Sequence, residues 1–175
     1  MKKYVIDACN LIFFDRTLFA TYENHGFQQA RELLVSMLSR FAHIEGLDEV
    51  IAVFDGSEKS SHYPHRHRQA LGKVALIFTS PRIDADHYII EMIEDSKQPG
   101  QFTVISNDKF ILRNVQKSGA HTMGCGNFLR TFKRRAQQAA DPLRGEDPRK
   151  FHGLSAREVE EWCKYFGLDE KGTIS

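Results

Sequence analysis

Apolar residues in this chain occur as short unbroken runs that are separated by longer amphipathic segments. Four of the runs are rich in β-branched and aromatic residues: Tyr4 to Ile6, Val50 to Phe54, Val74 to Phe78 and Phe102 to Ile105. Such runs, without alternation of polar residues, are typical of parallel strands that are covered on both faces. A weaker run from Ala120 to Met123 predicts a fifth strand at a sheet edge.

The segments between these runs carry helical patterns. The clearest is a continuous apolar stripe made of Ala30, Leu33, Leu34, Met37, Leu38, Phe41 and Ile44. A second helix is predicted to begin near Asp86, and a third to run from about Asp108 to Ser118, where Gly119 stops it. Strands and helices therefore alternate. This order predicts an α/β fold in which right-handed crossovers place helices on both faces of a parallel sheet.

The length of the chain, 175 residues, fits one compact domain. We assign this main domain to residues 1–135. Residues 136–153 contain two Asp-Pro pairs and no apolar periodicity, which predicts a linker or loop. A last helix is expected over residues 154–168, docked on the same domain, because Ser155 and Glu158 form a capping box.

The cysteines and the hydropathy indicate the cellular compartment. Cys9, Cys125 and Cys163 are odd in number and lack the CxxC spacing, which argues against a disulfide framework and a zinc knuckle. No stretch resembles a signal peptide or is long enough to cross a membrane. We therefore expect a cytoplasmic protein without a membrane partner.

Charge is distributed unevenly along the chain, although the net charge is only +1. The small net charge argues against a tail-driven binder of polyanions. The segment from His62 to Lys73 includes Arg66 and Arg68 and has no acid, whereas residues 84 to 95 include five acids. Acidic and basic surfaces are therefore expected to be separate.

Aspartates follow the predicted strands at corresponding places. Asp7 and Asp55 come directly after the first two strands, and Asp108 follows the fourth by a few residues. The carboxyl ends of parallel strands share one edge of a sheet, where ligands bind. Asp86, with Asp84 beside it, enters after the third strand at the start of a helix. Four or five carboxylates are thus expected in one cleft.

Clustered carboxylates raise one another's pKa and need a multivalent cation to neutralise them. An oxygen-only ligand set suits Mg²⁺ or Mn²⁺ better than zinc, and such sites usually act on phosphates. The alternative is that each aspartate is a turn former or a helix cap. Repetition at several strand ends favours the metal site.

Three polar residues near these strand ends each have two interpretations. Asn10 either fixes a carboxylate or caps a helix. Ser106 and Asn107 either contact a phosphate of RNA or simply begin the following helix. The pattern of residues leaves both interpretations open.

A basic segment is the candidate for RNA contact. Residues 62–68 are expected to form a loop, in which Arg66 and Arg68 can reach phosphates and Tyr63 can stack on an unpaired base. Lys73 follows in the same acid-free segment. The alternative is an ordinary solvated loop. Another basic group at residues 130–135 either extends this RNA-contact segment or is the solvent-exposed face of a helix.

With these residues in view, the chain resembles the YacP-like bacterial ribonucleases, a branch of the NYN domains in the PIN-like nuclease superfamily. The matching motifs are VIDACNLI at 5–12, AVFDG at 52–56, VALIFTS at 74–80, DADHYI at 84–89 and VISNDKFI at 104–111. The resemblance implies a three-layer α/β/α sandwich around a parallel sheet of about five strands. It also implies cleavage of single-stranded RNA with Mg²⁺ or Mn²⁺, including mRNA on the ribosome.

The resemblance also assigns roles to individual residues. Carried over by position, the catalytic residues are Asp7, Asn10, Asp55, Asp86 and Asp108. The predicted metal ligands are Asp7, Asp86 and Asp108, together with Asp84, an additional acid at the same place. The chain departs from the family pattern at positions 8 and 9, where Ala-Cys replaces the more usual Gly-Tyr, and in the length of the linker.

Two other functions compete with a nuclease. One is a non-catalytic RNA-binding or ribosome-docking module with the same fold, against which the intact carboxylates argue. The other is a nucleotide-dependent enzyme. Gly124-Cys125-Gly126 is the motif that suggests it, but this motif lacks the third glycine of a dinucleotide fingerprint and follows the last strand rather than the first.

Overall fold

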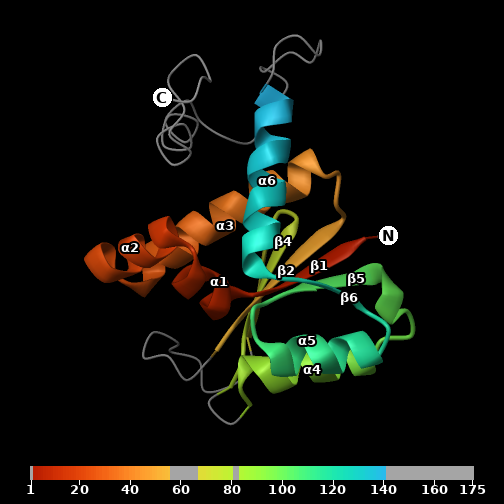
Figure 1. Ribbon diagram of the computed structural model, residues 1–175. Helices are drawn as coiled ribbons and strands as arrows, with labels where there is room; N and C mark the ends of the chain where they lie inside the picture. The colour runs from red at the N-terminus through yellow and green to blue at the C-terminus, as the bar shows by residue number, and fades with distance from the viewer. Residues whose placement is uncertain (1, 56–66, 81–82, 141–175) are drawn as a thin grey trace. The chain divides into compact units, whose positions relative to one another are not determined.

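The computed structural model describes residues 2–55, 67–80 and 83–140 (Figure 1). The chain divides into two compact units, Met1–Phe128 and Leu129–Ser175. The first unit contains the sheet. Of the second unit the structure describes residues 129–140, which continue the helix that starts in the first unit.

In the described residues, six strands form one sheet in the order β3-β4-β2-β1-β5-β6. The strands are β1 (Lys3–Asp7), β2 (Glu49–Phe54), β3 (His67–Leu71), β4 (Val74–Phe78), β5 (Phe102–Ile105) and β6 (His121–Met123). All neighbouring pairs are parallel except β3 with β4, which is antiparallel. The predicted parallel sheet of about five strands is therefore confirmed, and β3 is an addition that the sequence did not indicate.

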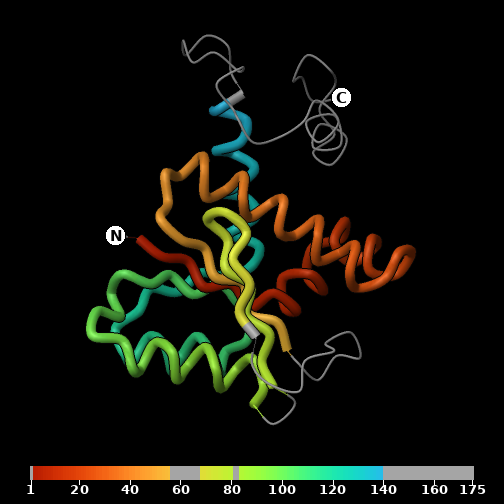
Figure 2. Tube along the Cα trace, turned by 180° about the vertical axis from the view of Figure 1, so that it is seen from behind, coloured from red at the N-terminus to blue at the C-terminus, as the bar shows by residue number. Residues whose placement is uncertain are grey.

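The additional strand β3 forms a hairpin with β4, the yellow hairpin in Figure 2. The turn passes through Gly72, whose positive φ of 59° is a conformation that glycine adopts without strain. The sequence of β3 lacks an apolar run because this strand lies at the edge of the sheet and its described side chains are exposed. Assignment of His67 and Arg68 to a loop was therefore wrong.

Helices cover both faces of the sheet. They are α1 (Ala8–Phe14), α2 (Arg16–His25), α3 (Phe27–Ile44), α4 (Ala85–Glu94), α5 (Lys109–Lys117) and α6 (Cys125–Ala140), with a short 3₁₀ helix at Pro99–Gln101. Figure 1 shows α4 and α5 together on one face and α3 on the opposite face. The predicted helices that became α3, α4 and α5 are confirmed, whereas α1 and α2 were not predicted.

Apolar packing on the two faces holds the three layers together. Toward α4 and α5, Val5, Ile51, Val53 and Ile77 of the strands join Ile89 and its neighbours on the helices in one buried cluster. On the other face, Tyr4 packs edge-on against Phe41 of α3, with ring centroids 5.0 Å apart. Burial of both faces explains why these strands read as unbroken apolar runs.

The end of the predicted main domain needs a correction. Helix α6 continues to Ala140, so residues 136–140 are helical and do not belong to a linker. The rest of the predicted linker and the predicted helix at residues 154–168 lie outside the described residues. None of the helices in the described part of the chain has the length and apolar character needed to cross a membrane.

Candidate acidic site at the carboxyl edge of the sheet

The predicted carboxylates come from one edge of the sheet because their strands are parallel. Asp7 is the last residue of β1, which lies between β2 and β5. Asp55 follows the last residue of β2, and Asp108 caps α5 just beyond β5. Asp86 lies in the first turn of α4. Asp7 therefore has the central place among them.

Asp7 is buried, with only 5% of its surface exposed. Its Oδ1 accepts a hydrogen bond of 3.1 Å from the backbone N–H of Asn10, and its Oδ2 accepts one of 2.9 Å from the hydroxyl of Ser106. Burial raises the pKa of Asp7 to about 6, repulsion by Asp86 and Asp108 adds to the rise, and the two hydrogen bonds oppose it. The protein thus holds a carboxylate whose charge is poorly stabilised.

Asp86 experiences the same electrostatic environment. Its pKa is raised, first by burial and then by the charges of Asp108, Asp84 and Asp55. These repulsions indicate that Asp86 lies close enough to interact with Asp55 and Asp108, which come from distant parts of the sequence. The acidic cluster forms only when the sheet is assembled.

Asp108 and Asp84 both cap helices. Asp108 Oδ1 accepts hydrogen bonds from the backbone N–H groups of Phe110 and Ile111, at 2.6 and 3.4 Å. Asp84 Oδ1 accepts from the backbone N–H and from Nδ1 of His87, at 2.8 and 2.7 Å. The hydrogen bond from the backbone N–H of His87 is the main cause that lowers the pKa of Asp84, and Asp84 raises the pKa of His87. The capping interpretation therefore holds for both aspartates, in addition to their place at the site. It also holds for Asp7, whose carboxylate caps α1 through the backbone N–H of Asn10.

Ser106 is a buried link between β5 and the central aspartate. Its hydroxyl donates to Asp7 and accepts a hydrogen bond of 2.9 Å from the backbone N–H of Asp108. The side chain has no exposed surface. Burial of Ser106 argues against the RNA contact that we predicted, and its hydroxyl bonds instead to Asp7 and to the backbone of Asp108.

Asn10 and Asn107 connect three loops of the same edge. The side-chain oxygen of Asn10 accepts from the backbone N–H of Asn107 at 3.0 Å, and that of Asn107 accepts from the backbone N–H of Cys125 at 3.0 Å. These bonds join the segments that follow β1, β5 and β6. Asn107 is exposed, but its side-chain oxygen is already occupied by the hydrogen bond from Cys125.

The two glycines around Cys125 have packing roles. A Cβ atom on Gly124 would come 3.2 Å from Oδ1 of Asn107, and one on Gly126 would come 3.3 Å from the ring of Phe14. Close packing therefore accounts for the GxG motif at this position. The motif therefore has a packing explanation that does not require a bound nucleotide.

The basic residues predicted to contact RNA lie elsewhere or outside the described residues. Tyr63 and Arg66 are not among the described residues. Lys73 precedes β4 and lies at the amino ends of the parallel strands, about 16 Å from the opposite edge at the usual rise per residue. The structure therefore does not bring Lys73 to the carboxylates.

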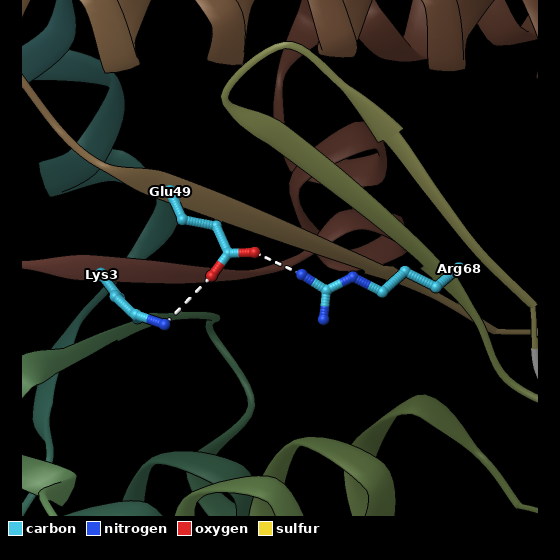
Figure 3. Close-up of polar contacts among 3 residues, drawn as sticks. All are labelled: Lys3, Glu49 and Arg68. Carbon is cyan, nitrogen blue, oxygen red and sulfur yellow. Dashed lines mark hydrogen bonds and ion pairs between the residues drawn. The ribbon is translucent and has the colours of Figure 1, made fainter.

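Arg68 extends from β3 toward the amino end of β2. Figure 3 shows the carboxylate of Glu49 between the Lys3 ammonium, at 3.1 Å, and the guanidinium of Arg68. Glu49 is the first residue of β2, whereas Asp55 follows the last. The backbone of Arg68 pairs with Ile77 near the carboxyl end of β4, and only its guanidinium reaches the amino end of β2. Of these two basic residues, Lys73 alone lies at the edge opposite the acids.

The donor atoms of the cluster suit a hard divalent cation. Asp7, Asp86 and Asp108 offer carboxylate oxygens, and burial raises the pKa of the neighbouring Cys125 thiol to about 12, so this sulfur stays protonated and is a poor metal ligand. Among the residues that the structure describes, however, no three acidic, histidine or cysteine side chains already stand in a metal-binding arrangement. The chemistry of the donors fits Mg²⁺ or Mn²⁺. In this arrangement, however, Asp7 Oδ2 accepts a hydrogen bond from Ser106, and Asp108 Oδ1 accepts one from the backbone N–H of Phe110.

Sequence reasoning missed two residues beside the acids, His87 and Phe110. Both stand in the motifs that carried the family resemblance, one residue after Asp86 and two residues after Asp108. The available signal in the sequence was that Phe110 lies outside the apolar stripe that Ile111 and Val115 form on α5. The basic residues at 130–135 lie on α6, where Arg130, Lys133, Arg134 and Arg135 are exposed.

Comparison with known families decides where this chain belongs. The family model of the YacP-like NYN domain matches residues 4–166. The chain belongs to the YacP-like NYN family. Membership in this family indicates a nuclease-type, RNA-related function. A search of curated proteins gave no match.

Solved structures agree with the fold. The crystal structure of Rae1 (YacP) from Bacillus subtilis is similar with a TM-score of 0.64 and 23% sequence identity, over 94% of both chains. The crystal structure of a point mutant of the same protein is similar with a TM-score of 0.63 and 22% identity, over 84% of this chain and 86% of the other. The predicted YacP-like α/β fold is therefore confirmed.

Proposed function

We propose that this protein is a divalent-metal-dependent endoribonuclease that hydrolyses phosphodiester bonds in single-stranded RNA in the cytoplasm. The observation that carries the proposal is the convergence of Asp7, Asp86 and Asp108, whose mutual repulsion helps to raise the pKa values of Asp7 and Asp86. Helix capping alone does not require this electrostatic cost, because a serine or an asparagine caps equally well without a charge. A cation-binding role explains why carboxylates occupy these places.

The residues of the chain have separate roles in this proposal. Asp7, Asp86 and Asp108 would hold Mg²⁺ or Mn²⁺, and the hydroxyl of Ser106 and the backbone N–H of Asn10 keep the carboxylate of Asp7 in place. Asp55 would orient the attacking water. When bound, the cation supplies a water of lowered pKa and neutralises charge on the phosphate. Water forms the new bond to phosphorus while the bond to the 3′ oxygen breaks, which leaves 5′-phosphate and 3′-hydroxyl ends.

The carboxylate charge of Asp7 is tested by the nearly isosteric variant Asp7→Asn. The amide keeps the acceptor for the Asn10 N–H but loses the charge that attracts the cation, so we expect RNA cleavage in Mn²⁺ to fall by at least about a hundredfold. Cleavage of a labelled single-stranded RNA measures the loss. The matched control is Asp95→Asn at the far end of α4, which should cleave like the parent. Full activity of Asp7→Asn would refute the mechanism.

The main competing function is a non-catalytic RNA-binding or ribosome-docking module. Its supporting observation is that Asp7, Asp84 and Asp108 all serve as helix caps. A purified protein that binds RNA but releases no product in Mg²⁺ or Mn²⁺ would establish this alternative. Mapping RNA ends in cells with and without the protein identifies the RNA that is cut, including mRNA on the ribosome, which we include in the proposal.

A further inference from the structure

Two exposed aromatic rings stand beside the acidic site. His87 belongs to the first turn of α4 and Phe110 to the first turn of α5. Their ring centroids are 6.0 Å apart and the ring planes are tilted by 57°. Phe110 exposes 52% of its surface, and the side chain of His87 exposes 68%. The pair therefore presents aromatic surface to solvent next to the carboxylates.

The two residues are held by the same aspartates that shape the site. The Nδ1 atom and the backbone N–H of His87 both bond to Oδ1 of Asp84. The backbone N–H of Phe110 bonds to Oδ1 of Asp108 at 2.6 Å. The imidazole of His87 is thus held in place by Asp84 and the backbone at Phe110 by Asp108, which lowers the entropic cost of binding at this surface.

The charge around the rings selects the kind of group that fits. A groove of about 550 Å³ adjoins His87 and is lined by Ile83, Asp84, Ile90, Glu91 and Glu94. Its carboxylates repel a phosphate but accept hydrogen bonds from amino groups. An uncharged flat group with N–H donors at its edge, which is the chemistry of a nucleobase, matches both the rings and the groove.

We propose that Phe110 and His87 form a stacking platform for one unpaired base of the RNA, next to the phosphate that is cleaved. This proposal rests on the proposed ribonuclease function and adds a substrate-positioning surface to it. Asp86 precedes His87 by one residue and Asp108 precedes Phe110 by two, so a base on the platform belongs to a nucleotide that adjoins the site. Stacking on an aromatic side chain contributes about tenfold to affinity.

The chain offers a matched control on another helix. Phe13 of α1 exposes 46% of its surface, close to the value for Phe110. Its ring packs against Phe19 and Tyr22, with centroids 6.2 and 5.3 Å apart. Phe13→Leu therefore removes a similarly exposed ring whose contacts are with α2 and not with His87.

The experiment pairs protein variants with a series of RNA oligomers in which one base at a time is removed. Affinities are measured by fluorescence anisotropy in Ca²⁺, with gels to verify that the RNA stays intact. For the parent we expect one abasic position to weaken binding about tenfold. That difference should vanish in Phe110→Leu and remain in Phe110→Trp and in Phe13→Leu. Thermal melting verifies that each variant is folded.

Other outcomes overturn the platform. If Phe110→Leu shows the same abasic penalty as the parent, or weakens all oligomers equally, Phe110 does not stack on a base. A parent that cleaves RNA in Mn²⁺ but shows no such coupling refutes the platform and leaves the proposed function intact. A parent that neither binds nor cleaves RNA refutes both.

Discussion

At the scale of single residues, the cost of burying Asp7 predicts how pH affects stability without metal. The pKa of Asp7 is about 6 in the fold, against 3.8 for an unperturbed aspartate. The folded state therefore binds the proton more tightly, and stability falls as pH rises from about 4 to above 6. From the shift in pKa, the full cost at neutral pH is on the order of 2–3 kcal/mol.

Asp7→Asn tests this sign directly, because the amide has no charge to bury. In EDTA at a pH of about 7.5 we expect the thermal midpoint of the variant to exceed that of the parent, and at a pH of about 4.5 we expect the gain to be much smaller. Melting curves across this pH range measure the difference. A variant that is less stable than the parent by the same amount at every pH would assign Asp7 to a purely structural role.

At the scale of elements, the sequence allowed prediction of those parts that depend on local pattern. The buried parallel strands and the stripe of α3 have a simple periodicity, and the strand ends located the aspartates. Helices α1 and α2 were not predicted because the exposed Phe13, Phe14 and Phe19 obscure the apolar stripes of these helices. The bond between Ser106 and Asp7, which are 99 residues apart, depends on the register of β1 and β5, and no local pattern encodes it.

This link between elements gives a prediction for Ser106→Ala. The alanine leaves the Oδ2 of Asp7 without its donor and the backbone N–H of Asp108 without its acceptor. We expect the free energy of unfolding to fall by about 1–3 kcal/mol, as measured by urea denaturation. Ser118→Ala is the matched control, because its hydroxyl makes a local bond of 3.3 Å to Asn114 at the end of α5. Equal losses in both variants would contradict the positioning role.

At the scale of the whole molecule, the acidic cluster couples metal binding to folding. The carboxylates come from residues 7, 55, 86 and 108, which approach one another only in the native sheet. A cation that binds this cluster therefore stabilises the folded state and not the unfolded chain, by about 2.7 kcal/mol when its concentration is about a hundred times the dissociation constant. For a chain of this size, the thermal midpoint should rise by roughly 5–10 °C.

Differential scanning calorimetry with Mn²⁺ and with EDTA measures this rise. An equal ionic strength of KCl controls for simple screening, which weakens repulsion between exposed charges but acts less on a buried group such as Asp7.

Asp7→Asn should show a smaller rise with Mn²⁺ than the parent, because it starts with less repulsion and lacks one ligand. The carboxylate of Asp7 is bonded to Ser106 and that of Asp108 to the backbone N–H of Phe110. Reorienting them toward the cation costs free energy, which reduces the net stabilisation by the metal. A midpoint that does not change at millimolar Mn²⁺, together with no heat of binding in titration calorimetry, would show that the cluster is not a metal site.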